Sequence, residues 1–272
     1  MRLLCCVLVL LTTTAAGQDS DRIFKAFKTQ LAYNRSIPPR FFFGTKREAA
    51  RLDTLAVMDQ NVRSRTFNYI WQQDYEQAAD WLEKMTALYP KEHDTAGEIY
   101  LTTFQDYPRA LRHFDAYDAL TPRFDDIVGY NPVSYLKGLA WRGLGDQQKA
   151  IYQFSIAIDS VAMKHGGEWV NYKHYVSRAV SYIATKQPEK ALLDLDRAAK
   201  NFTRSALVQY HRGRALLLLN RTEEARTAFQ DASFFVKALR AERTGDYIED
   251  NFNLVYEAEI EEALERLKSQ NR

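Results

Sequence analysis

The side chains best suited to chemistry are histidines and carboxylates, because the sequence has only two cysteines, Cys5 and Cys6. His165, Glu168 and His174 lie within ten residues of one another. Imidazole and carboxylate groups are common zinc ligands, so this cluster raises the hypothesis of a metal-dependent hydrolase. The HExxH helix motif of metalloproteases is absent from the sequence, however. The metal enzyme therefore remains an alternative without a recognised motif behind it.

Two glycine-containing stretches are candidates for catalytic or phosphate-binding loops. The HGG sequence at His165 to Gly167 is similar to the oxyanion loop of some esterases, but the GxSxG nucleophile motif is absent. The stretch from Gly138 to Gly145 is not followed by the Lys and Ser or Thr that close a phosphate-binding loop. We therefore expect no catalytic residue, no cofactor and no metal ligand, and a chain that is not an enzyme.

The first seventeen residues have the composition of a secretory signal peptide. Arg2 precedes an apolar run from Leu3 to Leu11, and small residues follow up to Gly17. The run is too short to span a bilayer, and no other window approaches the roughly 20 apolar residues that a spanning helix needs. We predict that residues 1–17 are removed and that the mature chain is exported, periplasmic or secreted, and soluble. Both cysteines would leave with this segment, so no disulfide is expected.

The composition is that of a folded globular chain. Of the 272 residues, 46% are hydrophobic and 26% are charged, with a formal net charge of +2. Because acidic and basic residues are mixed along the chain, no strongly basic surface for nucleic acid is indicated. We expect no nucleic-acid partner and no membrane-spanning segment.

A periodic pattern of small and large residues organises most of the sequence. In the stretch YLKGLAWRGLGDQQKAIYQFSIAID, Gly138 and Trp141 are followed by Ala150, Phe154 and Ala157. Equivalent alanines recur along the chain at Ala78, Ala110, Ala150, Ala191 and Ala225. This pattern resembles the tetratricopeptide repeat, which has a period of about 34 residues. The resemblance is to an exported bacterial protein of this type.

The resemblance implies an all-α fold, namely a right-handed α-solenoid of about five helix hairpins. It places an N-terminal helical segment at residues 18–58, the repeat array at 59–245 and a C-terminal capping helix at 246–272. Residues from about Tyr247 to Leu267 are predicted to form that capping helix as a single element, since apolar residues recur among acidic ones. Wider spacing between some alanines predicts insertions near Phe124 to Tyr130 and near Met163 to Trp169.

Each repeat carries local signals for its second helix. Asp74, Asp106 and Asp146 stand where that helix should begin, and aspartate caps free amide groups there. Two antiparallel helices pack closely only where small side chains meet. We therefore expect Gly138 and Ala150 to face each other.

The resemblance implies that the first helices of the repeats line a concave face that holds a partner protein or peptide. Projection onto these helices predicts a shared basic and aromatic surface made by Tyr135, Arg142, Lys173, Tyr210 and Arg214. Arginine binds carboxylates through two hydrogen bonds, so an acidic or amphipathic peptide is the predicted ligand.

The sequence thus predicts a non-catalytic, protein-binding scaffold of the cell envelope. One alternative is a structural accessory subunit of an envelope secretion or assembly machine. The other is the metal-dependent hydrolase that would use the His165, Glu168 and His174 region. The insertion from Met163 to Tyr175 is open to two interpretations, a recognition loop or a longer helix end.

Overall fold

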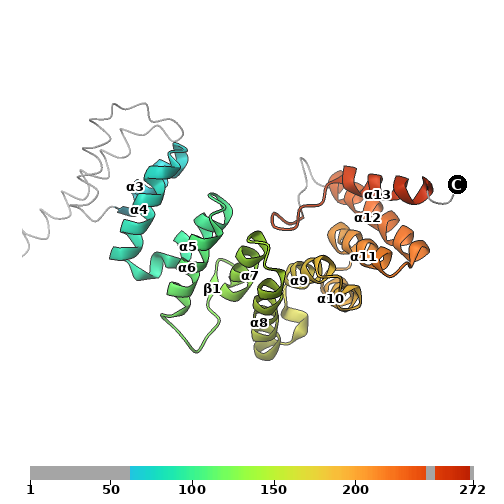
Figure 1. The fold of residues 1–272 in the computed structure, drawn as a ribbon, viewed down its shortest axis with the longest axis horizontal. Helices are drawn as coiled ribbons and strands as arrows, with labels where there is room; N and C mark the ends of the chain where they lie inside the picture. The colour runs from blue at the N-terminus through green and yellow to red at the C-terminus, as the bar shows by residue number, and fades with distance from the viewer. Residues whose placement is uncertain (1–61, 243–248, 270–272) are drawn as a thin grey trace, which may run out of the picture. The chain divides into compact units, whose positions relative to one another are not determined.

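The computed structural model describes residues 62–242 and 249–269. The predicted signal peptide at 1–17 and the predicted N-terminal segment at 18–58 lie outside the described residues. The chain divides after Glu92 into two compact units. The described part of the first unit is a hairpin of α3 (Val62–Trp71) and α4 (Tyr75–Leu88), followed by the short 3-10 helix η1 (Pro90–Glu92) (Figure 1).

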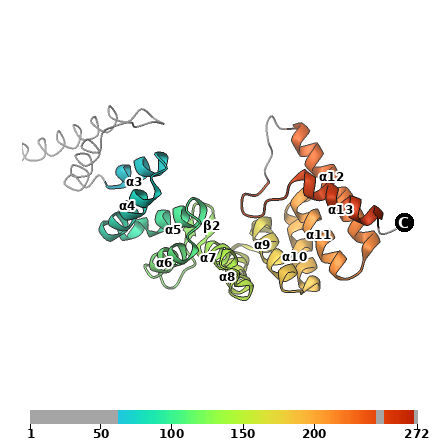
Figure 2. The same cartoon turned by 45° about the horizontal axis from the view of Figure 1, so that its top comes forward.

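The second unit is a succession of helices in which each packs against the next (Figures 1 and 2). Its helices are α5 (His93–Thr102), α6 (Tyr107–Asp118), α7 (Val133–Gly143), α8 (Gln147–His165), α9 (Tyr172–Ala184), α10 (Pro188–Asn201), α11 (Ala206–Leu218), α12 (Thr222–Glu242) and α13 (Glu257–Ser269). The predicted all-α solenoid of helix hairpins is confirmed. Within the described ranges, no helix is both long enough and apolar enough to cross a membrane.

The five recurring alanines occupy one structural position. Each lies on the second helix of a hairpin and has no exposed surface; they are Ala78, Ala110, Ala150, Ala191 and Ala225. A methyl group is the largest side chain that fits where two helices approach closely, so these positions select alanine.

The glycines of the first helices face aromatic rings of the second helices. A Cβ atom added to Gly138 would lie 2.5 Å from the Phe154 ring, so Phe154 is the nearest side chain on the facing helix, whereas the expected pairing with Ala150 stays a prediction. The same relation joins Gly97 to Phe114 and Gly213 to Phe229. The α9–α10 hairpin instead has buried Ala179 and Leu195 at the equivalent positions. Where the first helix has alanine instead of glycine, the second helix thus has leucine instead of phenylalanine.

Every hairpin turn contains one residue in the left-handed backbone conformation. These residues are Gln73, Gln105, Gly145, Lys186 and Asn220, with φ between 53° and 83°. In the Lys186 turn, the Gln187 amide donates to the Tyr182 carbonyl oxygen at 2.8 Å. This geometry ends the first helix by satisfying its free carbonyl groups.

Three of the second helices begin at the predicted aspartate caps. Asp74 accepts from the Gln77 amide at 3.2 Å. Asp106 and Asp146 accept in the same way from the amides three residues later, at 3.1 and 3.0 Å. The predicted caps are therefore confirmed.

The two predicted insertions have different structures. The first contains an antiparallel pair of two-residue strands, β1 (Ile127–Val128) and β2 (Asn131–Pro132). In the second, α8 extends to His165, and the short 3-10 helix η2 (Gly167–Trp169) leads into α9. The part of the insertion from Met163 to His165 is therefore a longer helix end.

The capping helix starts later than predicted. α13 begins at Glu257 and packs on α12, with Ile260 and Leu267 buried. Residues 249–256, predicted as the first part of this helix, are not helical. They bind distant residues instead, as described below.

A buried ion pair joins the two helices of one hairpin. Arg178 on α9 donates to Asp194 on α10 through Nε and Nη2, each at 2.7 Å. Its third nitrogen donates to Ser155 of α8 at 3.0 Å. Arg178 therefore connects two successive hairpins.

Candidate functional site

The first helices of the repeats form one side of the second unit. α9 contacts both α7 and α11, and α5 contacts α7, so these four helices lie next to one another. We call this side the inner face. Residues 249–256, the crossing segment, return from the end of α12 and run over α11, α9 and α7 (Figures 1 and 2).

Asn253 is the central contact of the crossing segment. Arg142 on α7 donates through Nη1 to Asn253 Oδ1 at 2.6 Å and through Nη2 to the Phe252 carbonyl oxygen at 2.8 Å. The Asn253 amide nitrogen donates to Ser177 Oγ of α9 at 2.8 Å and to Asp250 Oδ2 at 2.6 Å. Both ends of this side-chain amide are therefore satisfied, and Asn253 is 6% exposed.

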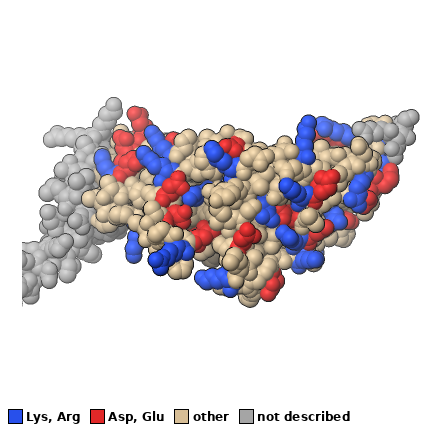
Figure 3. All heavy atoms as spheres, turned by 60° about the horizontal axis from the view of Figure 1, so that its bottom comes forward, with Lys and Arg blue, Asp and Glu red and all other residues tan. Residues whose placement is uncertain are grey.

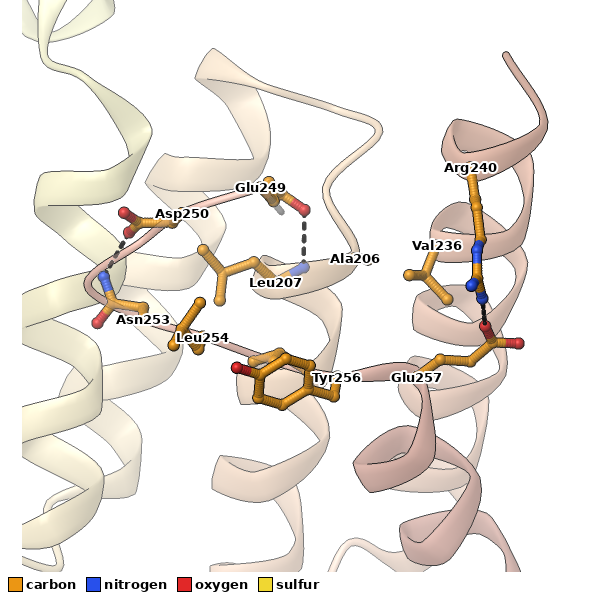
Figure 4. Close-up of a pocket in the computed structure, with 11 residues that line it drawn as sticks. Ala206, Leu207, Val236, Arg240, Glu249, Asp250, Asn253, Leu254, Tyr256 and Glu257 are labelled. Atoms are coloured by element: carbon orange, nitrogen blue, oxygen red, sulfur yellow. Dashed lines mark hydrogen bonds and ion pairs between the residues drawn. The ribbon is translucent and has the colours of Figure 1, made fainter. Parts of the chain in front are cut away.

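Glu249 binds at the beginning of α11. Its carboxylate accepts from the Leu207 backbone amide at 3.2 Å (Figure 4). It also accepts from the Tyr172 hydroxyl at 3.0 Å. The Ser205 hydroxyl donates to the same carboxylate. A negative charge is favoured at this end of a helix, because the free amides and the helix dipole both attract it.

Phe252 and Tyr135 meet edge to face, with ring centroids 6.5 Å apart. Tyr135 is buried, its hydroxyl lies 3.0 Å from Ser177 Oγ, and its ring centroid is 4.2 Å from that of His174. Burial raises the pKa of Tyr135, and the nearby Asp250 carboxylate raises it further. Tyr135 thus forms part of the floor beneath the crossing segment.

Arg142 carries a largely buried positive charge. Burial lowers the pKa of this guanidinium, while Tyr135 and Asp250 act in the opposite direction. Arginine stays protonated in proteins, so the charge needs acceptors. The crossing segment supplies them through Asn253 and the Phe252 carbonyl oxygen.

The other three residues of the predicted surface are Lys173, Tyr210 and Arg214. Lys173 on α9 lines a pocket of about 240 Å³ together with Asn251 and Phe252. On α11, the Arg214 guanidinium lies 5.9 Å from the Tyr210 ring centroid. The structure therefore brings Tyr135 and Arg142 to the crossing segment and Lys173 beside it, whereas Tyr210 and Arg214 contact each other.

Two further open pockets border the crossing segment. One, of about 290 Å³, is lined by Leu207, Val236 and Leu254, and the Arg240–Glu257 ion pair at 2.8 Å stands at its edge (Figure 4). The other, of about 660 Å³, lies over α5 and α7 and is lined by residues that include Leu101, Leu139 and Phe252. The inner face therefore continues beyond the crossing segment toward α5.

The residues of the metal-enzyme alternative do not form one site. His165 and Glu168 are exposed, whereas His174 is buried and its Nε2 lies 3.2 Å from Asn131 Oδ1. Within residues 62–242 and 249–269, no group of three His, Cys, Asp or Glu residues is placed to hold a metal ion. Burial lowers the pKa of His174 to about 4 and, together with nearby arginines, that of His211 to about 3.

Charges of both signs are distributed over the molecule. On the face shown in Figure 3, basic and acidic side chains of the described residues are interspersed.

Sequence periodicity missed the residues that hold the crossing segment in place. Glu249, Asp250 and Asn253 fall within the predicted capping helix. Ser177 and Ser205 belong to no recognisable motif. The run Glu-Asp-Asn-Phe-Asn contains asparagines and an aspartate that favour caps and turns over helix interiors. This composition was the available signal that the capping helix begins later.

Comparison with known proteins identifies the fold. No family model matches the sequence, and no curated protein matches it either. Among solved structures, MamA from Desulfovibrio magneticus RS-1 has a TM-score of 0.52 at 18% identity, covering 68% of this chain and 97% of that one. YrrB, described as a TPR protein with an unusual peptide-binding site, has a TM-score of 0.50 at 14% identity, covering 66% and 90%.

Yeast Tom70 has a TM-score of 0.55 at 17% identity. The alignment covers 84% of this chain but only 44% of Tom70. These likenesses agree with the stacked hairpins, the buried alanines and the capped second helices. The chain therefore has the all-α solenoid fold of tetratricopeptide-repeat proteins.

Proposed function

We propose that the chain is a non-catalytic scaffold that holds an extended segment of a partner protein on its inner face. The observation that carries the proposal is the crossing segment itself. It accepts hydrogen bonds from Arg142 of α7 and from the Leu207 amide of α11, and it donates one to Ser177 of α9. A face that binds a non-helical stretch of this chain has the groups needed to bind a similar stretch of another protein.

The chemistry of the inner face favours an acidic partner. Arg142 offers two nitrogen donors, and the beginning of α11 offers a backbone amide and the Ser205 hydroxyl. Donors of this kind bind carboxylates and carbonyl oxygens. The peptide-binding site for which YrrB is described supports the view that this fold can hold peptides.

Site-specific photocrosslinking tests the binding face. A photoreactive residue at Lys173, on the inner face, should capture a partner in cells that express the chain. The matched control is Tyr152 on α8, which is 64% exposed and lies on a second helix. Recovery of a defined partner from position 173 and not from 152 would support the proposal. Equal capture from both positions, or none from either, would refute it.

We also propose that the scaffold works outside the cytoplasm, in the periplasm or as a secreted protein. The support is the apolar run from Leu3 to Leu11 followed by small residues up to Gly17. N-terminal sequencing of the chain from fractionated cells tests this. A mature form that begins near Gln18 in the exported fraction is expected, whereas a cytoplasmic chain that still begins at Met1 would contradict it.

A further inference from the structure

We infer that residues 249–254 are a built-in competitor for the partner, so that the partner binds by displacing them. This inference rests on the proposed function, because the competitor and the partner would share the inner face. It also gives the chemistry of the partner segment. That segment is non-helical, like residues 249–254, with a carboxylate that reaches the beginning of α11 and, four residues later, a side-chain amide or similar group that meets Arg142.

The contacts of these residues are those of a bound ligand more than those of a core element. Glu249, Asp250 and Asn253 point polar groups into the inner face, while Asn251 and Leu254 are exposed. The principal contacts are hydrogen bonds to α7, α9 and α11. Hydrogen bonds of this kind can be exchanged for equivalent ones from another chain with little net change in free energy.

The rest of the fold does not depend on the competitor. α13 remains attached to α12 through buried Ile260 and Leu267 and through ion pairs such as Lys237–Glu261 at 2.7 Å. The repeat hairpins are held by their own alanines and rings. Departure of residues 249–254 would therefore leave the solenoid and its capping helix in place.

The inner face also provides a place where a partner can begin to bind. The pocket of about 660 Å³ over α5 and α7 is open and borders Phe252. A partner that occupies it would reach Arg142 and Phe252 next, because both residues line the same pocket. A partner longer than the competitor would thus gain contacts that the competitor does not make.

Because competitor and face belong to one chain, the competitor acts at an effective concentration of roughly millimolar order. The apparent dissociation constant of a partner is its intrinsic value divided by the fraction of chains whose face is free. Acidic peptides that bind weakly are therefore kept off the inner face. Only a partner with additional contacts displaces residues 249–254. Weakening the competitor should strengthen partner binding without any change in the face itself.

The test uses the mature chain, residues 18–272, and a fluorescent peptide of residues 249–256 as the probe. Fluorescence anisotropy should show that Asn253→Ala binds the probe at least about tenfold more tightly than the unaltered chain, because the competitor loses its contacts with Arg142 and Ser177. The matched control Asn251→Ala alters an exposed side chain of the same segment and should bind the probe as the unaltered chain does.

Two further variants identify the site and guard against misfolding. Arg142→Gln added to Asn253→Ala should lose the probe, since the inner face then lacks the guanidinium that donates to Asn253 and to the Phe252 carbonyl oxygen. Glu249→Gln is a second way to weaken the competitor and should also bind the probe more tightly. Circular dichroism of each variant must show the helical content of the unaltered chain.

The outcomes separate the two proposals. Equal binding of the probe by the unaltered chain and by both weakened variants would overturn the competitor while leaving a peptide-binding face. No binding by any correctly folded variant would overturn the inner face as a peptide site, and with it the competitor. Binding that survives Arg142→Gln would place the probe elsewhere and overturn both.

Discussion

Arg142 and Asn253 are 111 positions apart in sequence, and their side chains are joined by a hydrogen bond of 2.6 Å. In a solenoid, most contacts connect a repeat to its neighbours. This bond instead connects α7 to a segment that follows α12. Together with the Asn253–Ser177 and Tyr172–Glu249 bonds, it is a long-range contact in a fold built mainly from contacts between neighbouring repeats.

The Arg178–Asp194 pair should be important for stability. Asp194→Ala leaves a buried guanidinium without its carboxylate, and removal of one partner of such a pair costs about 3–5 kcal/mol. Urea denaturation should show a fall of this order in the free energy of unfolding. The matched control Glu224→Ala breaks the exposed pair with Arg221 and should leave that free energy nearly unchanged. Equal effects of the two substitutions would contradict the burial argument.

The contact between Gly138 and Phe154 predicts a rescue. Gly138→Ala places a Cβ against the buried ring, and this overpacking should lower the free energy of unfolding by about 1–3 kcal/mol. The loss should exceed the gain of about 1 kcal/mol that alanine has over glycine in helix propensity. The double variant Gly138→Ala with Phe154→Leu copies Ala179 and Leu195 of the next hairpin. It should recover most of the loss in thermal unfolding. A double variant less stable than Gly138→Ala would contradict this packing relation.

Much of this fold follows from local sequence. The alanine pattern and the caps at Asp74, Asp106 and Asp146 predicted the hairpins, because each signal acts within one repeat. The close contact of Gly138 with the Phe154 ring was not predicted, since a helical pattern gives a face but not the neighbour that fills it. Left-handed turns at Gln73 and Lys186 were not predicted, because only glycine and asparagine signal that conformation strongly.

The candidate site was predictable only in part. The charge and aromatic character of α7 led to Tyr135 and Arg142, whose role as partner-binding residues remains a prediction. Glu249 and Asn253 could not be found in this way. Their binding sites on α11 and α9 lie 42 and 76 positions away, and helical periodicity contains no information about such distances.

The left-handed turn at Lys186 predicts a stabilising substitution. Lys186 is exposed and has φ 56°, a conformation in which a Cβ costs about 1 kcal/mol. Lys186→Gly should therefore raise the free energy of unfolding by about 0.5–1 kcal/mol, as measured in urea. Lys186→Ala retains the Cβ and should show no such gain. A gain of equal size with alanine would show that backbone strain is not the cause.

His174 predicts a pH dependence of stability. Burial lowers its pKa from 6.5 to about 4, so between these values the unfolded chain binds a proton that the folded chain does not. The contribution of His174 to the free energy of unfolding is therefore fully present above pH 6.5. It is lost as pH falls toward 4, by about 1.4 kcal/mol per pH unit for each such group.

His174→Phe keeps a ring beside Tyr135 and removes this proton-binding group. Urea denaturation across that pH range should give a shallower slope for the variant than for the unaltered chain. His211, whose pKa is also lowered, contributes its own slope in both proteins. Identical slopes would contradict the buried, neutral state of His174.

The crossing segment has a mechanical consequence. A stack of hairpins deforms like a coil spring, since small changes at each junction add along its length. Because residues 249–253 attach to α7, α9 and α11 at once, they act as a strut that resists extension of these three repeats. The rigidity of the stack therefore depends on what lies across its inner face, and an occupant that bridged fewer helices would leave a more compliant molecule.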